Sequence, residues 1–347
     1  MNNAMPKIEI YKLKKREEKE WDAYVLKHPN STFFHQMGWK RVVERTYKHK
    51  PIYLIARENE EIKGVLPLFL MKHMIFGKRL ISVPFGPYGG VCADNKKATH
   101  MLIEEAKRIV REEDLDYLEL RSIEKHNSDL ITNDLYVTFI INLDVNPQTV
   151  WNRMKRDRKR NVEKANKAGL EVEWDATIEE FYKIHARTMR DFGTPTHGLE
   201  FFKNCLREFP RNAKVLTVKY NGEAICCQFL FFYKDTVIAV WGSSLKEYKT
   251  YHPEQLCIWE VIKYGCEKGY KYFDFGRCLR NTGVYSYKER WGGYPKQLYY
   301  QYYLKNAKEA PDFTSMNPKR KKFAEIWKKL PLKMTTAIGP LIRKEIP

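Results

Sequence analysis

The stretch Phe273–Pro295, FDFGRCLRNTGVYSYKERWGGYP, carries the most information about the fold of this chain. Together with Tyr272, its first residues predict a strand over 272–275 that ends in the step Gly276-Arg277. A glycine at a strand end lets the backbone approach a ligand, and an arginine beside it aims a fixed cation at that ligand. The sequence therefore predicts a binding site where this strand ends.

An aromatic run follows that strand and carries one lysine, Lys288. Tyr285 and Tyr287 precede the lysine, and Trp291 follows it before Gly292-Gly293. Aromatic rings around a cation keep water away from it, which strengthens its attraction for negative charge. This combination favours a site for an anionic or acyl ligand over a plain core strand.

The composition is that of a strongly basic globular protein. The 347 residues include 62 lysines and arginines against 43 acidic residues, a formal charge of +19, and 43% of them are hydrophobic. This length accommodates two domains with their own cores. The excess charge favours polyanions, namely nucleic acid, anionic lipid head groups or phosphate-rich small molecules, with a merely soluble basic protein as the alternative.

We expect a cytoplasmic protein without a metal site. The first twenty residues hold no apolar signal-like region, and no apolar run approaches the roughly 18 residues of a membrane span. Seven cysteines without a CxxC pair predict buried, reduced thiols. Histidine and cysteine do not cluster at metal-ligand spacing, so we expect no metal and no bound cofactor.

The chain repeats one order of elements. Residues 51–70 and 214–232 both predict strand, turn, strand. The first hairpin is followed by a strand over 80–84, the loop FGPYGG, a helix near 98–113 and a strand over 117–121. The second is followed by VIAVWGSS, a helix near 253–269 and the strand over 272–275. Two such runs in register predict tandem copies of one domain in an α/β protein with mixed sheets.

The boundary between the copies is expected near 143–150, where LDVNPQTV holds a proline and polar turn residues. This gives an N-terminal domain over 1–147, a C-terminal domain over 148–310 and a helical tail over 311–347. In the tail, Phe323, Ile326, Trp327 and Leu330 fall at helical spacing. We expect the tail to dock on the body of the protein; the alternative is that it lies on a membrane surface with its lysines toward anionic lipid.

A basic segment joins the two copies. Residues 151–169, WNRMKRDRKRNVEKANKAG, predict one helix that packs through Met154 and Ala165 and is capped by Gly169. Its other side presents five cations: Arg153, Arg156, Arg160, Lys164 and Lys167. Like charges on one stripe repel unless an anion is near, which favours contact with tRNA or a phosphorylated substrate; a solvated helix face is the alternative.

Familiar motifs for covalent catalysis and nucleotide binding are absent from the sequence. It holds no GxSxG, GxxxxGK[ST] or HExxH pattern, and no GxGxxG that opens a helix. A repeated strand–loop–helix plan with basic and aromatic loops suits catalysis by positioning and charge stabilisation, in which two substrates react directly.

These residues resemble the Fem family of aminoacyl transferases, whose members carry two tandem GNAT-like acyltransferase domains. The resemblance covers nearly the whole chain, through FFHQMGWKRVVERTY, PFGPYGG, MKRDRKRNVEKANKAGLEVE and, most specifically, YKYFDFGRCLRNTGVYSYKERWGG. The sequence is most similar to the Fem-type proteins associated with exosortase and exopolysaccharide systems, and its second half to the BioF2-like acetyltransferase domain. The resemblance implies transfer of an aminoacyl or acyl group to an amine, without a covalent enzyme intermediate.

The resemblance also implies roles for individual residues. Lys288 falls where the family places a lysine near the reacting carbonyl, with a pair to Glu289 or another surface carboxylate as the alternative. Arg190 falls where relatives hold a substrate phosphate, with a salt bridge on the helix surface as the alternative. Asp274 is expected to orient the amine or take its proton, or else to cap Arg277 structurally. The remaining expected substrate contacts are Tyr88, Gly89, Trp241, Tyr285, Tyr287 and Trp291, and the expected catalytic set is Lys288, Asp274 and Arg277.

The resemblance leaves the donor open. Aminoacyl-tRNA is expected, with a phosphate-bearing precursor of the cell envelope as acceptor, because KTYHPEQ stands where a GNAT pyrophosphate loop would be. Acyl-CoA is the alternative donor, in an N-acyltransferase of exopolysaccharide biosynthesis. A third possibility is a non-catalytic protein that binds RNA or a membrane surface. We expect a cytoplasmic monomer whose N-terminal copy is silent and binds the acceptor, with peripheral contact at the inner face of an anionic membrane as an open possibility.

Overall fold

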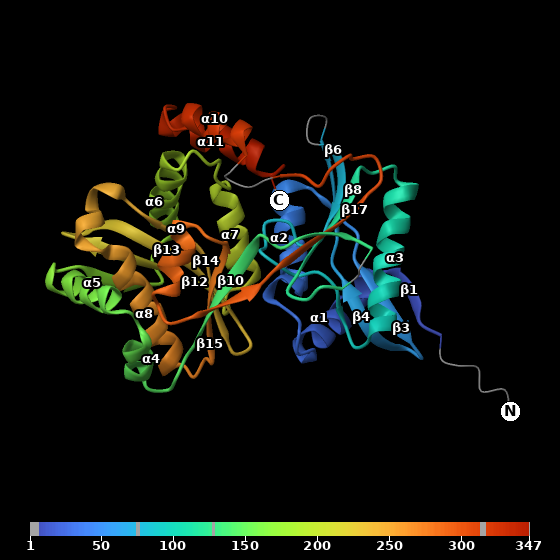
Figure 1. Cartoon of the computed structure of the whole chain (residues 1–347), viewed down its shortest axis with the longest axis horizontal. Coiled ribbons are helices and arrows are strands. Elements are labelled where there is room, and N and C mark those ends of the chain that lie inside the picture. The colour runs from blue at the N-terminus through green and yellow to red at the C-terminus, as the bar shows by residue number, and fades with distance from the viewer. Residues whose placement is uncertain (1–6, 74–76, 127–128, 313–316, 347) are drawn as a thin grey trace. The chain divides into compact units, whose positions relative to one another are not determined.

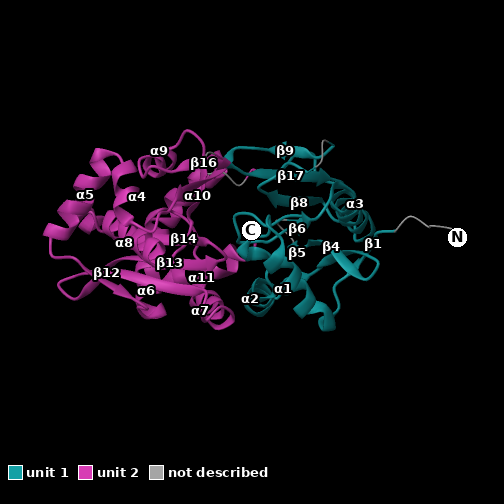
Figure 2. Cartoon of the chain, turned by 90° about the horizontal axis from the view of Figure 1, so that it is seen from below, with its two compact units in different colours: residues 1–136, 297–311, 347 teal, residues 137–296, 312–346 magenta. Residues whose placement is uncertain are grey.

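The structure, a computed structural model, describes residues 7–73, 77–126, 129–312 and 317–346. Its backbone is a mixture of helices and mixed sheets, as predicted (Figure 1). The chain divides into two compact units: residues 1–136, 297–311 and 347 belong to unit 1, and residues 137–296 and 312–346 to unit 2 (Figure 2).

Unit 1 contains two sheets. The first has the order β1-β3-β4-β7, and the second β2-β5-β6-β8-β17-β9. The strands are β1 (Glu9–Lys12), β2 (Lys50–Pro51), β3 (Leu54–Glu58), β4 (Glu61–Leu66), β5 (Phe69–His73), β6 (Gly77–Ile81), β7 (Cys92–Ala93), β8 (Tyr117–Ser122), β9 (Ile131–Asn133) and β17 (Tyr299–Leu304). The α-helices are α1 (Glu18–Lys27), α2 (Met37–Tyr47) and α3 (Lys96–Glu112).

Unit 2 is built on one seven-stranded sheet of order β11-β12-β13-β14-β15-β10-β16. Its strands are β10 (Tyr136–Asn142), β11 (Glu171–Trp174), β12 (Ala213–Tyr220), β13 (Glu223–Tyr233), β14 (Thr236–Ser244), β15 (Tyr272–Leu279) and β16 (Tyr294–Gln297). Its α-helices are α4 (Pro147–Arg153), α5 (Arg156–Lys167), α6 (Ile178–Asp191), α7 (Leu199–Glu208), α8 (Pro253–Glu267), α9 (Gly283–Glu289), α10 (Pro318–Trp327) and α11 (Leu332–Arg343).

The predicted duplication is confirmed by the strand pairing. In unit 1, β6 and β8 are parallel and α3 connects them; in unit 2, β14 and β15 are parallel and α8 connects them. A parallel pair requires such a crossover, and a helix that buries one apolar face on the sheet provides it. Both crossover helices contribute to the core of their unit, α3 through Leu102 and Ala106 and α8 through Leu256 and Val261.

The two copies differ at one proline. In unit 2, β13 runs for 11 residues and pairs with both β12 and β14. The stretch 51–70, predicted as a single hairpin, is instead interrupted at Pro67, so that β4 pairs with β3 in one sheet and β5 with β6 in the other. Proline has no N–H to donate to a strand ladder, which explains the break.

The last strand of each copy lies in the other unit. Strand β10 follows the first copy in sequence but lies beside β15 in unit 2. The sequence predicts residues 297–310 in the second domain and residue 311 in the tail, yet residues 297–311 belong to unit 1, because β17 pairs with β8 from Tyr299↔Ser122 to Leu304↔Tyr117. Long-range strand pairing of this kind leaves no mark on local sequence patterns.

The C-terminal segment belongs to unit 2. Helix α11 packs on α6, with Thr335 and Gly339 buried, and Trp327 of α10 is 3% exposed. None of the helices in the described ranges combines the length and apolarity that a membrane crossing requires. All seven cysteines are buried free thiols, and the described residues bring together no cluster of side chains that could hold a metal ion.

Candidate functional site

The candidate site of unit 2 lies where β14 and β15 stop pairing. Their parallel register runs from Thr236↔Tyr272 to Ile238↔Asp274. Beyond these residues, each strand continues to its own end, at Ser244 and at Leu279. Two strands that part in this way open the sheet between them, and the residues just past the last pair face that opening.

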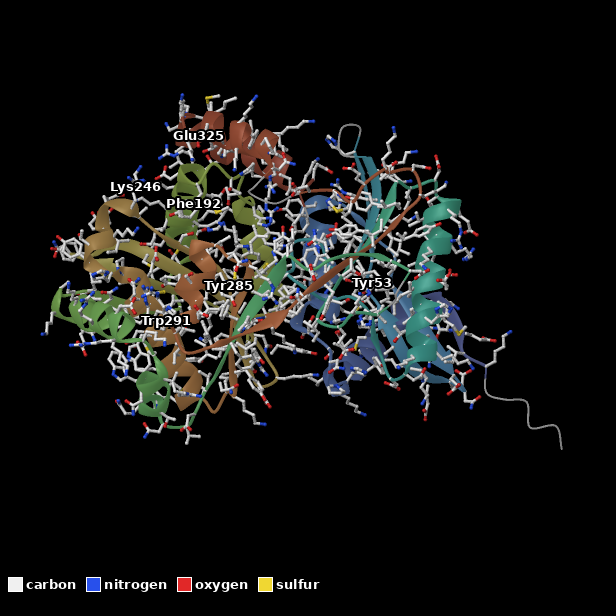
Figure 3. The ribbon with its side chains drawn as sticks, in the orientation of Figure 1. Tyr53, Phe192, Lys246, Tyr285, Trp291 and Glu325 are labelled. Carbon is white, nitrogen blue, oxygen red and sulfur yellow. The ribbon has the colours of Figure 1, made fainter. Side chains whose placement is uncertain are left out.

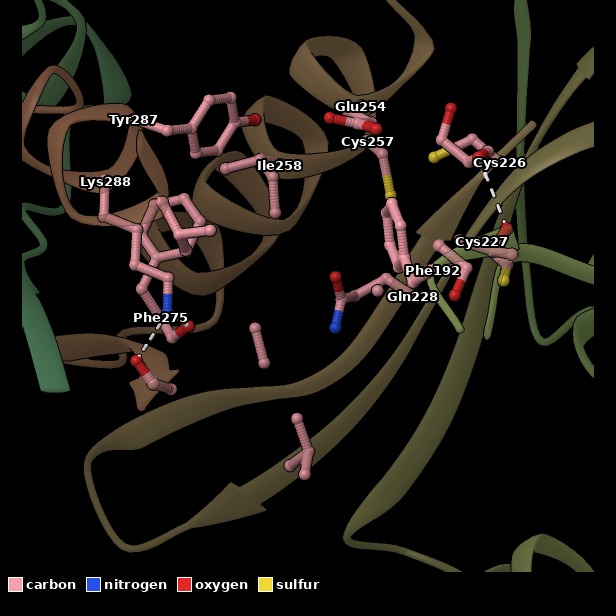
Figure 4. Close-up of a pocket in the computed structure, with 18 of the residues that line it drawn as sticks. Phe192, Cys226, Cys227, Gln228, Glu254, Cys257, Ile258, Phe275, Tyr287 and Lys288 are labelled. Carbon is pink, nitrogen blue, oxygen red and sulfur yellow. Dashed lines mark hydrogen bonds between the residues drawn. The ribbon is translucent and has the colours of Figure 1, made fainter. Parts of the chain in front are cut away.

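A cavity of about 450 Å³ occupies this opening (Figure 4). Helices α6, α8 and α9 and strands β13, β14 and β15 contribute to its wall. Its lining residues include Thr188, Phe192, Cys226, Gln228, Val240, Gly242, Ser244, Glu254, Phe275, Gly276, Arg277, Val284, Tyr287 and Lys288. This volume falls within the range of small-molecule sites, and the wall is largely apolar with a few polar groups.

Lys288 lies in the wall of this cavity and is 7% exposed. Its ammonium group donates hydrogen bonds to the carbonyl oxygens of Phe275, Gly276 and Arg277, at 2.7, 2.6 and 3.3 Å. Burial lowers the pKa of the lysine, while nearby Cys278 and Asp274 raise it. The lysine therefore holds the very stretch of β15 that lines the cavity, rather than pairing with a surface carboxylate.

The Gly-Arg step lies inside strand β15, which is longer than the predicted strand of 272–275. Gly276 has a φ of +73°, and a Cβ there would lie 2.9 Å from the carbonyl oxygen of Ala239. Only glycine adopts this conformation without strain, and it turns the backbone toward the cavity. The lysine contacts keep the turned strand in place, which is why β15 continues beyond the step.

Asp274 supports the turn at Gly276 through hydrogen bonds. The residue is fully buried, and its carboxylate accepts hydrogen bonds from the Gly276 amide at 2.8 Å and from the Thr138 hydroxyl. Of the expected catalytic set, Arg277 and Lys288 line the cavity, whereas Asp274 is not among the described lining residues. The geometry therefore favours a structural role for Asp274, through Gly276 and Thr138, whereas the structural alternative from the sequence was a cap of Arg277.

The aromatic run forms helix α9, which begins after Thr282. Tyr287 lines the cavity, and the Arg158 guanidinium lies 4.8 Å from the centre of its ring. Trp291 is fully buried and packs at 5.9 Å from Phe275, whereas Tyr285 meets Phe139 edge-on at 4.8 Å. Of the three predicted aromatics, Tyr287 thus lines the cavity, and the other two, in α9 and just after it, pack on the core of unit 2.

Glu254 is a cavity residue that sequence reasoning missed. It stands in the first turn of α8, directly after Pro253, and its carboxylate lies in the cavity wall (Figure 4). Burial raises the pKa of the Glu254 carboxyl above its usual range. The cations Lys249 and Arg158 and a hydrogen bond with Ser244 lower this pKa in part. The usable signal was an acidic residue at the start of the helix where a GNAT pyrophosphate loop would stand.

Besides Tyr285 and Trp291, two more predicted substrate residues of unit 2 lie outside the lining of this cavity in the described chain. Arg190 is in α6, and its guanidinium pairs with Asp191 at 2.6 Å. Trp241 packs against the rings of Phe201 and Phe202. Residues 239, 240 and 242–244 of the same strand line the cavity, whereas the ring of Trp241 is held among the phenylalanine rings of α7.

The corresponding place in unit 1 is nearly filled. A cavity of about 20 Å³ lies there, with Gly89 among its lining residues. Arg121, which occupies the register position of Gly276, is 3% exposed and donates to Glu119 at 2.7 Å and to the Gly86 carbonyl at 3.0 Å. Tyr88 is also buried. A space of this size holds about one water molecule, far less than the cavity between β14 and β15.

The basic segment 151–169 forms two helices where one was predicted. Helix α4 ends at Arg153, Met154 is extended, and α5 begins at Arg156. Arg153 donates to the Asn142 carbonyl at 2.6 Å and therefore lies on a different helix from the other four cations. Those four, all exposed on α5, are Arg156, Arg160, Lys164 and Lys167. Gly169 has the predicted left-handed conformation after α5, with a φ of +73°.

The α5 cations lie next to one end of the cavity. Helices α5 and α8 pack together. The pKa of His252, the residue before α8, is lowered first by burial and then by Lys164, Arg158 and Arg160. A positive potential therefore surrounds the N-terminus of α8, close to Glu254.

Comparison with known proteins agrees with this geometry. Residues 152–289 match the model of the acetyltransferase (GNAT) domain family, a range that contains every lining residue of the large cavity. The chain has a Fem-like tandem GNAT fold. None of the curated proteins matches this sequence.

Three solved structures show the likeness in fold. FemX superposes with a TM-score of 0.67 at 17% identity, over 86% of this chain and 98% of that chain. A tandem GNAT protein from the clavulanic acid biosynthesis pathway gives 0.56 at 10% identity, over 86% and 98%. L-PGS from Bacillus licheniformis gives 0.55 at 10% identity, over 92% and 98%. The predictions of tandem GNAT-like domains and of an acyltransferase of the GNAT type are confirmed.

Proposed function

We propose that this protein transfers an aminoacyl group from aminoacyl-tRNA to an amine of a cell-envelope precursor. The observation that carries the proposal is the cavity between β14 and β15, which has a buried lysine, Lys288, on one wall and a carboxylate, Glu254, on another. An acyl carbonyl and an amine need groups of opposite charge, one to stabilise an oxyanion and one to accept a proton.

The reaction follows from these two groups. The acceptor ammonium gives a proton to Glu254, whose raised pKa makes it a stronger base than an ordinary glutamate. The amine then attacks the ester carbonyl of the donor, a C–N bond forms and the ester C–O bond breaks. As the C–O bond breaks, the attacking nitrogen loses its second proton and the leaving ribose oxygen takes one up. Glu254 releases the first proton to solvent, so the protein ends as it began.

Lys288 acts through its charge and through the strand that it holds. Three backbone carbonyls already accept its hydrogen bonds, so its positive charge, rather than a spare N–H, favours the developing oxyanion. By fixing Gly276 and Arg277, it also positions the arginine that lines the cavity beside it. Preorganised charge of this kind is a major source of rate enhancement.

The charge around α8 supports tRNA as the donor. The exposed α5 cations can follow a phosphate backbone, and Lys164, Arg158 and Arg160 extend their field to His252 beside the cavity. A CoA pyrophosphate would have to approach the first turn of α8, where Glu254 presents a like charge. Repulsion between Glu254 and the pyrophosphate disfavours CoA at this place. A charged tRNA avoids this repulsion when its phosphates contact α5 and only its ester linkage enters the cavity.

Acyl-CoA remains the second candidate donor. The match of residues 152–289 to the acetyltransferase (GNAT) domain family favours it. The likeness in fold to the tandem GNAT protein from the clavulanic acid biosynthesis pathway, a structure without AcCoA, is compatible with it. On this alternative, the protein is an N-acyltransferase, with exopolysaccharide biosynthesis as the expected setting.

A donor screen under single-turnover conditions tests the proposal. The protein in excess is mixed with labelled aminoacyl-tRNAs or acyl-CoAs and with a peptidoglycan-precursor peptide that carries a free amine. We expect amide formation from a charged tRNA and none from acyl-CoA. Turnover with acyl-CoA alone would replace the first candidate by the second, and salt-sensitive RNA binding without any transfer would indicate a non-catalytic binding protein.

A further inference from the structure

Two adjoining helices of unit 2 leave apolar side chains uncovered. In α11, Met334, Ile338 and Leu341 recur at i, i+4 and i+7 and are 49%, 38% and 63% exposed. The opposite side of α11 is packed, since Thr335 and Gly339 are buried. In α10, Phe323 and Ile326 are also exposed, the latter by 65%. These five residues, Phe323, Ile326, Met334, Ile338 and Leu341, are called the outer row below.

The helices that carry the outer row are firmly seated. Trp327 of α10 is buried, and its ring lies 3.6 Å from the Cβ position of Gly339 in α11. A Cβ at Gly193, just after α6, would lie 2.5 Å from the Cβ of Ala324 in α10, so the two backbones are in close contact. The exposed row is therefore not a loose tail that lacks a partner; it remains outside after the helices have packed.

Positive charge surrounds the outer row. Residues 318–344 contain nine lysines and arginines and one acid, Glu325, which pairs with Lys328 at 2.7 Å. Lys319, Lys322, Lys329 and Lys333 are exposed. Apolar side chains that enter the acyl boundary, combined with lysines that attract anionic head groups, are the pattern by which interfacial helices bind a bilayer.

The cavity opens next to these helices. Phe192 is 68% exposed and lines the cavity, and the next residue is Gly193, which touches α10 (Figure 3). Val284, another lining residue, is 54% exposed. Two exposed apolar residues thus lie in the wall of the cavity, one of them next in sequence to the residue that contacts α10, all within unit 2.

We propose that α10 and α11 dock unit 2 on an anionic lipid bilayer and present the cavity to an acceptor held in that membrane. The docking itself does not depend on the transfer reaction. The choice of a membrane-borne acceptor rests on the proposed function. An acidic protein or RNA would satisfy the lysines, but neither calls for five uncovered apolar side chains beside them.

Vesicle sedimentation with the full chain tests the docking. Vesicles of phosphatidylcholine alone are compared with vesicles that also contain phosphatidylglycerol. We expect at least about tenfold stronger binding to the anionic vesicles, because each basic residue near such a surface adds to the attraction. No binding to either vesicle, or equal binding to both, would overturn the proposal.

Variants of the outer row identify the surface. Leu341→Asp is expected to weaken vesicle binding by about tenfold, since the leucine can no longer enter the apolar layer. Val145→Asp is the matched control: it makes the same change at a residue of unit 2 that is 83% exposed and remote in sequence from both helices. An equal loss in the two variants would contradict the assignment.

A charge variant keeps the test decisive if Leu341→Asp lowers stability. Lys322→Gln combined with Lys329→Gln leaves every apolar contact in place and should remove most of the preference for phosphatidylglycerol. Retained preference would overturn the proposal. The same proteins are assayed for transfer to a soluble amine: docking variants that keep this activity separate a failure of docking from a failure of the proposed reaction.

Discussion

Replacement of Lys288 by methionine tests the site most directly. The substitution keeps an unbranched chain up to Cε but removes the ammonium that donates to three consecutive carbonyls at 2.7, 2.6 and 3.3 Å. Hydrogen bonds from a charged donor contribute more than neutral ones, and carbonyls left without a donor add a cost. The loss of the buried charge offsets part of this, because its desolvation is relieved.

We expect Lys288→Met to lower the free energy of unfolding by about 2–4 kcal/mol and the single-turnover rate by about 100-fold or more. Urea denaturation measures the first, and transfer from the active donor measures the second. The rate should fall more than the donor affinity, because the lysine acts on the developing charge and on the geometry of Gly276 rather than on the donor's phosphates.

Lys107→Met is the matched control for this variant. Lys107 is also a buried lysine, 3% exposed, but it lies in unit 1 and bonds to Glu104 and Asp129 at 2.8 and 2.7 Å. The Lys107→Met protein should be less stable than the parent protein, but the fraction that is folded should keep the parent's transfer rate. A folded Lys288→Met protein with the full rate would refute the reasoning, and so would an equal loss of rate in both variants.

Three further predictions concern other groups. Glu254→Gln should lower the transfer rate at neutral pH by about 100-fold and abolish the acid limb of its pH profile, which should lie above the usual glutamate pKa because burial raises it. Arg160→Gln with Lys164→Gln should reduce the slope of log affinity for tRNA against log salt by about 1.4 to 1.8 in a binding titration. Burial lowers the pKa of His185 to about 3 and that of His197 well below its usual value. The unfolded chain therefore binds protons first, so stability in urea should fall as the pH drops from about 6.5 toward 3, by at most about 1.4 kcal/mol per pH unit for each histidine.

Each of these predictions has a control in the same chain. Glu267→Gln changes an exposed acid at the far end of α8 and should leave the pH profile intact. Lys96→Gln with Lys97→Gln removes two exposed cations of α3 and should not alter the salt slope. His185→Gln should flatten the acid dependence of stability, whereas His100→Gln, at an exposed position, should not. The opposite result in any pair would refute the corresponding assignment.

The sequence predicted much of the site because its signals are local. Gly276 and Lys288 lie within 13 residues of each other, and both belong to the cavity. Glu254 was missed because an acidic residue at the start of a helix does not by itself show that this helix faces the end of β15. Arg190 and Trp241 were expected at the site, but Arg190 pairs with a neighbouring carboxylate and Trp241 packs against the rings of α7.

Hydrophobic periodicity, turn residues and the order of elements were enough to determine the mixed α/β class, the duplication and the crossover helices. These features depend on neighbours within one or two turns of chain. Only the tertiary structure decided that β10 and β17 are exchanged between the units, that α4 and α5 are separate, and that Lys288 holds three carbonyls of β15. Such outcomes depend on contacts between residues far apart in sequence. Packing and hydrogen bonding at these contacts decide which pairing has the lower free energy, and a local sequence pattern contains no information about them.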